Sequence, residues 1–172
     1  SMNRLRNILL CICAILYSTA VYSQVVINQI MYDTPYNEQI AIGEAYSNGE
    51  FVELYNVGDT AVSLSGWTLC GDGKTEIFAF DNVQLPPNGY LAVAYRHKQT
   101  PEFALDSIYP MSGKDATQQI IYQRKIVLNN SGERICLRDA VGNIADSIYY
   151  DGNSNKRKPD RLSADNQDSI PY

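Results

Sequence analysis

Short segments with alternating apolar and polar residues run through most of the chain, from residue 25 to residue 150. Apolar side chains at every second position are typical of a β-strand with one buried face. In the segment 50–56, for example, Val52 and Leu54 share one face. No long run in this part of the chain keeps the spacing of an amphipathic helix, so the pattern predicts an all-β protein.

Turn signals separate these segments. They are Gly71-Asp72-Gly73, Pro86-Pro87-Asn88-Gly89 and Asn129-Asn130-Ser131-Gly132, all rich in residues that favour tight turns. The predicted strands cover residues 25–31, 50–56, 62–64, 67–70, 76–80, 90–95, 119–122, 134–138 and 144–150. About seven to nine short strands with frequent turns predict an immunoglobulin-like β-sandwich with Greek-key connections.

The pattern divides the chain into three parts. Residues 1–23 have the form of an expression-tag remnant followed by a signal peptide, with Arg4 and Arg6 before an apolar run and cleavage after Ala20 or Ser23. The apolar run is shorter than the roughly 18 residues that a membrane-spanning helix needs. We therefore expect an exported protein, which is secreted, periplasmic or on the cell surface.

The sandwich is expected to occupy residues 24–151, and residues 152–172 form a polar tail or linker. Because this tail stops abruptly at Tyr172, we expect a longer protein to continue beyond it.

Charge narrows the classes of partner. The chain carries 14 basic and 19 acidic residues, a net charge of −5. Such a surface disfavours nucleic acid and anionic membranes as the main ligand. The basic cluster Lys156-Arg157-Lys158 lies in the polar tail without interleaved aromatic residues, so it reads as a solvated linker.

Two of the four cysteines, Cys11 and Cys13, belong to the predicted signal peptide. In an exported protein the remaining pair, Cys70 and Cys136, can form a disulfide. The alternative is two unpaired thiols on a strand surface, and the spacing leaves both open.

The sequence contains few candidates for catalytic residues. His97 is the one histidine and lies between two cations at a polar strand end, where a solvated side chain is expected. Glu50 and Glu53 point to opposite faces of a strand, which argues against a shared acid–base role; Glu53 is expected to pair with a cation on a neighbouring strand.

Two further stretches resemble known motifs but lack residues that those motifs require. Gly71-Asp72-Gly73-Lys74-Thr75 resembles the end of a phosphate loop, but Thr68 stands where that motif needs glycine and a strand follows it. The stretch beginning Asp151-Gly152-Asn153 has calcium-loop spacing, but it lacks the required glycine and glutamate at Lys156 and Leu162. No catalytic, cofactor or metal residue is predicted, and no cofactor is expected.

Five stretches in order resemble the lamin-tail domain family. They are residues 49–56, 62–69, 85–93, 128–139 and 142–150, which include Gly-Glu-Phe-Val-Glu-Leu-Tyr-Asn and Leu-Ser-Gly-Trp-Thr-Leu. The resemblance implies an immunoglobulin-like sandwich in which Val52, Leu54, Leu64, Trp67 and Leu69 are core residues. It implies no enzyme.

The resemblance also bears on function. Together with the predicted export signal, it implies a non-catalytic binding or adhesion module of a bacterial surface or secreted protein. We expect contacts with protein or glycan, or with another domain of the same chain, through the loops 33–48 and 96–117. The alternative is an accessory domain of a secreted hydrolase, of nuclease or phosphatase type, encoded further along the same chain.

Overall fold

Ten β-strands make up the part of the chain that the computed structural model describes, which is residues 23–32, 50–74, 78–96, 118–125 and 127–151. They are β1 (Val25–Met31), β2 (Phe51–Asn56), β3 (Val62–Ser63), β4 (Thr68–Cys70), β5 (Phe78–Ala79), β6 (Gln84–Leu85), β7 (Tyr90–Tyr95), β8 (Gln118–Gln123), β9 (Gly132–Arg138) and β10 (Ile144–Asp151). The prediction of an all-β fold is confirmed. The strand that the pattern did not predict is β6, which has two residues and immediately precedes the turn at Pro86.

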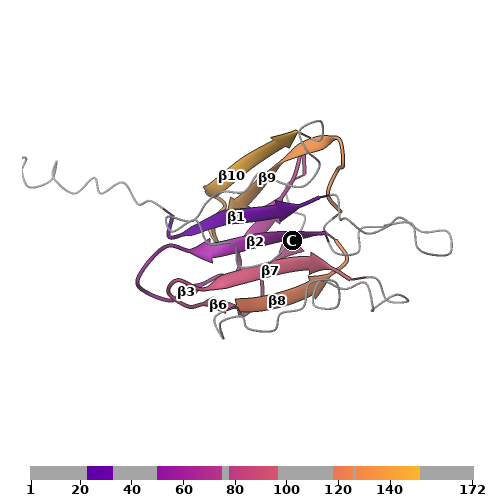
Figure 1. Cartoon of the computed structure of the whole chain (residues 1–172). Helices are drawn as coiled ribbons and strands as arrows, with labels where there is room; N and C mark the ends of the chain where they lie inside the picture. The colour runs from indigo at the N-terminus through magenta and orange to yellow at the C-terminus, as the bar shows by residue number, and fades with distance from the viewer. Residues whose placement is uncertain (1–22, 33–49, 75–77, 97–117, 126, 152–172) are drawn as a thin grey trace, which may run out of the picture.

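Two four-stranded sheets form the body of the molecule. The first sheet has the strand order β1-β2-β7-β8 (Figure 1). The second has the order β10-β9-β4-β5, and a small sheet pairs β3 with β6. The chain passes from the first sheet to the second between β2 and β4, returns between β5 and β7, and crosses again between β8 and β9. These repeated crossings are typical of a sandwich, since neighbouring strands in each sheet come from distant parts of the sequence.

The core lies between the two sheets. Its fully buried members include Val52, Leu54, Leu91 and Val93 from the first sheet and Leu69, Ile135 and Leu137 from the second. Full burial of such a side chain contributes roughly 1.5–3 kcal/mol. Of the five residues expected in the core, Val52, Leu54, Leu64 and Leu69 are 0% exposed. Trp67 is only half-buried and packs against the margin of this cluster.

The sheet β1-β2-β7-β8 is buried on its other face as well. Met31, Phe51, Ala92 and Ala94 form a second buried cluster there, with Ile120 and Tyr122 packed against it. As a result, every residue of β2 is buried, including the carboxylate-bearing Glu53.

Strands β1 and β10 join the two sheets along one edge. Both strands have a register shift at this point, and the Ile27 amide donates a hydrogen bond of 2.8 Å to Asp146 Oδ2 across the gap. The rings of Tyr32 and Tyr150 stack with centroids 4.4 Å apart. Burial, together with the nearby Glu133 carboxylate, raises the pKa of the Tyr150 phenol, which stays neutral and donates to Glu133 Oε1.

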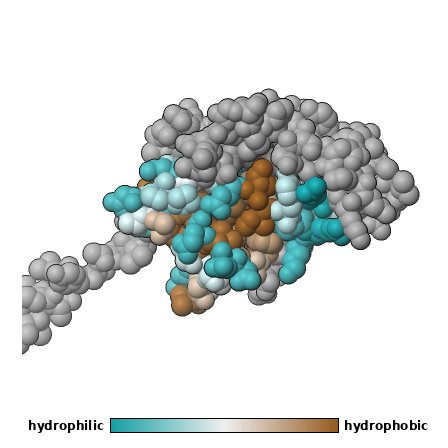
Figure 2. Space-filling view, turned by 90° about the horizontal axis from the view of Figure 1, so that it is seen from below, coloured by the Kyte–Doolittle hydropathy of each residue, from teal (hydrophilic) through white to brown (hydrophobic). Residues whose placement is uncertain are grey.

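At the opposite edge of the sandwich, the described residues of the two edge strands are partly buried or exposed. Its edge strands β8 and β5 contribute the half-buried Ile121 and Phe78 to the margin of the core. Figure 2 shows the molecule from the side on which β6 and β8 lie, and a hydrophobic strip is visible there between hydrophilic residues.

Candidate functional site

A tight turn between β3 and β4 fixes the position of Trp67. Gly66 adopts a φ of +79°, a conformation that side-chain-bearing residues rarely adopt. The Trp67 amide donates to the Leu64 carbonyl at 2.9 Å, and the Trp67 carbonyl accepts from the Phe80 amide at 2.9 Å. The backbone of this residue is therefore held on both sides, while its indole remains partly open to solvent.

The hairpin between β9 and β10 faces this turn and is held by its own hydrogen bonds. Asp139 Oδ1 accepts from the amides of Val141 at 3.0 Å and Asn143 at 2.8 Å, and Oδ2 accepts from the Asn143 side chain. Desolvation opposes ionisation of Asp139, but these hydrogen bonds prevail and lower the pKa of its carboxyl group. The hairpin thus presents a fixed negative charge beside Trp67.

Trp67 and the hairpin enclose a surface hollow of about 560 Å³, which we call the tryptophan hollow. Its lining residues are Ser23, Gln24, Val62, Trp67, Asp139, Asn143, Ile144 and Ala145. An aromatic face beside amide and carboxylate groups suits a ligand that has both an apolar face and hydrogen-bonding groups.

A second hollow of about 330 Å³ lies next to the first, and we call it the basic hollow. Its lining residues are Gly71, Asp72, Gly73, Lys74, Arg134, Cys136, Arg138 and Ile144. Ile144 lines both hollows and is 56% exposed, so it forms the ridge between them. The two hollows therefore adjoin each other at Ile144.

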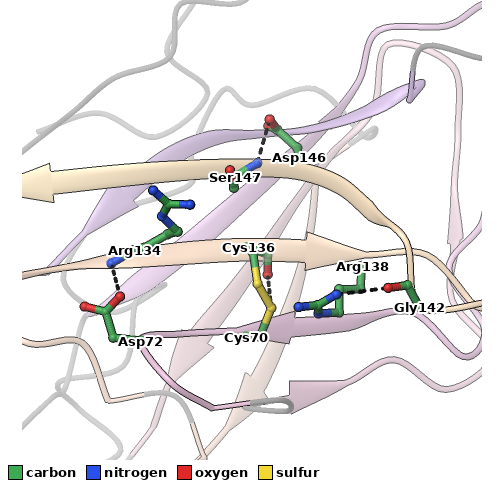
Figure 3. Close-up of a disulfide and its surroundings, with 8 residues drawn as sticks. All are labelled: Cys70, Asp72, Arg134, Cys136, Arg138, Gly142, Asp146 and Ser147. Atoms are coloured by element: carbon green, nitrogen blue, oxygen red, sulfur yellow. Dashed lines mark hydrogen bonds between the residues drawn. A yellow bond between two sulfur atoms is a disulfide. The ribbon is translucent and has the colours of Figure 1, made fainter. Parts of the chain in front are cut away.

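One of the residues that line the basic hollow, Cys136, is joined by a disulfide to β4. Cys70 and Cys136 are directly paired in the register of β4 and β9, with Cα atoms 5.0 Å apart, and their sulfur atoms are bonded. Arg134 and Arg138 flank Cys136 along β9 (Figure 3), on the same face of the strand because side chains alternate. The cross-link therefore holds the two arginines at a fixed position relative to β4.

Two hydrogen bonds complete this arrangement. Asp72 Oδ1 accepts from the Arg134 amide at 3.1 Å, which holds the turn after β4 against β9 (Figure 3). Lys74, in the same turn, also lines this hollow. Arg138 Nη1 donates to the Gly142 carbonyl at 3.0 Å, leaving its other guanidinium donors for a ligand.

The two glutamates considered for acid–base chemistry have structural roles. Glu50 is 2% exposed, and its Oε2 accepts from the Leu128 amide at 2.8 Å. Glu53 is 0% exposed, and its Oε1 accepts from the side-chain amide of Asn28 at 2.7 Å. The partner that the structure gives Glu53 on the neighbouring strand is thus an amide, where we had expected a cation. Buried carboxylates need such hydrogen bonds because water cannot reach them.

Several predicted features lie outside the described residues. These are the signal peptide except for Ser23, His97, the loop 33–48, the loop 96–117 except for Arg96, the polar tail, and the partial calcium motif except for Asp151. Within the described ranges, no three His, Cys, Asp or Glu side chains gather closely enough to hold a metal ion. Nor do these ranges contain a helix long and apolar enough to cross a membrane.

The basic hollow was not predicted from the sequence. Lys74 and the two arginines of β9 are about sixty residues apart in the chain, and each is unremarkable by itself. One signal was available: antiparallel pairing of Cys70 with Cys136 would bring the turn at Lys74 beside Arg134, and Arg138 lies on the same face of the strand as Arg134.

Comparison with known proteins agrees with the fold. No curated protein matches the chain. A family model, described as Lamin Tail Domain, matches residues 18–152, and this family has an immunoglobulin-like fold. The predicted resemblance and the predicted immunoglobulin-like sandwich are therefore confirmed. Because the match covers well over half of the chain and the described strands form the expected sandwich, the protein belongs to the lamin tail domain family.

Proposed function

We propose that this protein is exported and acts as a non-catalytic binding or adhesion module, which holds protein or glycan at a cell surface. Membership of an immunoglobulin-like family is compatible with such a module. The predicted signal peptide supports export, and so does the disulfide between Cys70 and Cys136, because disulfides persist in oxidising compartments.

The observation that carries the proposal is the pair of adjoining hollows on either side of Ile144. They offer an aromatic face, an exposed aliphatic side chain and fixed polar groups on a frame whose strands are cross-linked. Rigid elements lose little conformational entropy when a ligand binds, so a surface of this kind suits recognition. It extends the recognition surface beyond the loops predicted from the sequence.

The test compares the full chain with two matched variants. Ile144→Glu places a charge on the ridge between the hollows, and Val127→Glu makes the same change at another half-exposed aliphatic residue, 49% exposed against 56%. Each protein is applied to a glycan microarray and to the purified cell-surface proteins of the producing organism. We expect at least one ligand that the native chain and Val127→Glu retain and Ile144→Glu loses.

Two results would overturn the proposal. One is that no ligand in either panel distinguishes the native chain from Ile144→Glu. The other is that the retained ligand is recovered chemically altered, since turnover would make the domain an enzyme. Near-ultraviolet and far-ultraviolet circular dichroism of all three proteins shows whether the substitutions leave the fold intact.

A further inference from the structure

The basic hollow reverses the sign of charge found over the chain as a whole. The protein has a net charge of −5. Three of the six Lys and Arg side chains in the described residues nevertheless line this one hollow, and its lining includes a single carboxylate, that of Asp72. Asp72 is already engaged as acceptor for the Arg134 amide. The local charge therefore favours an anionic group.

The three cations are arranged to hold such a group. Arg134 and Arg138 start about 13 Å apart on one strand face, at about 3.3 Å per residue, and the disulfide lies between them. Their long side chains can reach one anionic group together or hold two in succession. Guanidinium groups bind carboxylate and sulfate in a two-pronged geometry, and Lys74 adds a point charge at the side of the same hollow.

The surroundings of the hollow indicate what connects the anionic groups. The exposed Ile144 and the half-buried Trp67 lie on one side, and Tyr149, 62% exposed, pairs with Arg134 across β9 and β10. Flat apolar faces beside cations suit a chain of rings that carry both hydroxyls and acidic groups. In the tryptophan hollow, Asn143 Nδ2 already donates to Asp139 and Gln24 Oε1 accepts from Thr60, which leaves Asn143 Oδ1 and Gln24 Nε2 to bond hydroxyl groups.

Resting on the proposed function above, we propose that the basic hollow binds the carboxylate or sulfate groups of an acidic glycan, whose sugar rings lie against Ile144 and Trp67.

The charge pattern favours this ligand over nucleic acid. Each strand of duplex DNA carries a phosphate about every 3.4 Å, so a duplex that crosses both hollows would bring phosphates against the Asp139 carboxylate of the tryptophan hollow. An acidic glycan carries fewer charges per unit length. Acidic groups elsewhere on the protein are screened beyond about 8 Å at physiological salt.

The proposal is tested by titrating the full chain with defined probes. These are an oligogalacturonate, its neutral methyl ester, a sulfated chondroitin oligosaccharide, inorganic phosphate and single-stranded DNA. Trp67 is the chain's one tryptophan, so its fluorescence reports binding near the hollows, and calorimetry gives the affinity. We expect an acidic oligosaccharide to bind, its affinity to fall with added salt, and the methyl ester to bind at least about tenfold more weakly than the oligogalacturonate if that is the ligand.

Two double variants locate the binding site. Lys74→Gln/Arg134→Gln removes two cations whose side chains make no hydrogen bond among the described residues, and Arg124→Gln/Lys125→Gln removes the same charge at the end of β8. We expect the first to weaken binding about tenfold or more and the second to change it less than about twofold. Melting temperatures of both variants confirm that they are folded.

The remaining outcomes each decide against the proposal. If neither acidic oligosaccharide binds, if both variants bind equally, or if DNA binds as tightly as the glycan, the proposed ligand is wrong. Competition by inorganic phosphate at the same concentration as the oligosaccharide would show a site for a free anion only. A neutral glycan or a protein that is lost in Ile144→Glu would leave the proposed function standing while this inference fails.

Discussion

The disulfide between Cys70 and Cys136 closes a loop of 66 residues, and breaking it should lower stability measurably. In the chain-entropy account, a cross-link of this length disfavours the unfolded state by about 4 kcal/mol. For a folded domain of this size that corresponds to a fall in melting temperature of about 15 °C. The loss should appear when the native chain is reduced, because reduction keeps both sulfur atoms in place.

The assay is urea unfolding followed by Trp67 fluorescence, with Cys11→Ser and Cys13→Ser in the background so that one pair of thiols can react. Oxidised, reduced and Cys70→Ala/Cys136→Ala proteins are compared, and intact mass after alkylation shows whether the thiols are joined. The alanine variant should lose about a further 1 kcal/mol, since Cys70 is 0% exposed and its sulfur leaves a void. The dependence of unfolding free energy on urea should steepen on reduction, because the freed chain exposes more surface.

The reasoning is refuted if the reduced native chain unfolds within about 1 kcal/mol of the oxidised chain, with the same dependence on urea. It is also refuted if alkylation labels both cysteines without reduction.

Three further predictions follow from single contacts. Tyr150→Phe keeps the ring stacked on Tyr32 but removes the donor to Glu133, so the free energy of unfolding in urea should fall by about 1–2 kcal/mol; no change would show that the bond is not made. Gly66→Ala should lower the free energy of unfolding by about 1–3 kcal/mol, because a φ of +79° strains a residue that has a side chain. The same substitution should shift the fluorescence maximum of Trp67. An unshifted maximum with native stability would contradict the turn geometry. Hydrogen bonds lower the folded-state pKa of Asp139, so its contribution to stability is present above about pH 4 and is lost as pH falls through the lower folded value. Asp139→Asn should remove that part of the pH dependence from urea midpoints measured across this range, and an unchanged pH profile would count against the assignment.

The net charge of this protein does not describe the charge at its candidate site. A net charge of −5 correctly describes the chain, yet one hollow concentrates half of the described cations. Net charge governs solubility and long-range attraction, whereas a ligand in contact responds to charges within about 8 Å. The net charge therefore argues against a ligand with many closely spaced negative charges. It does not argue against a local site that binds a single anionic group.

The sequence by itself determined the strands and much of the core. The alternation around Val52 and Leu54, the turns at Pro86-Pro87-Asn88-Gly89 and Asn129-Asn130-Ser131-Gly132, and the five family stretches are local features. Local patterns record whether a strand has a buried face, because the period of two follows from the strand's own geometry. The family resemblance, which rests on these stretches, placed Leu64 and Leu69 in the interior, and both are fully buried.

Only the tertiary structure decided which strands became neighbours, and with them the candidate site. Alternation cannot show that Cys70 is opposite Cys136, that Lys74 shares a hollow with Arg134, or that the second face of β2 is covered so that Glu53 is buried. Nor could it show that Trp67 would lie at the margin of the core with part of its ring exposed. The physical reason is that strand pairing depends on many long-range contacts that are satisfied together, whereas each segment of sequence specifies only its own period and turns.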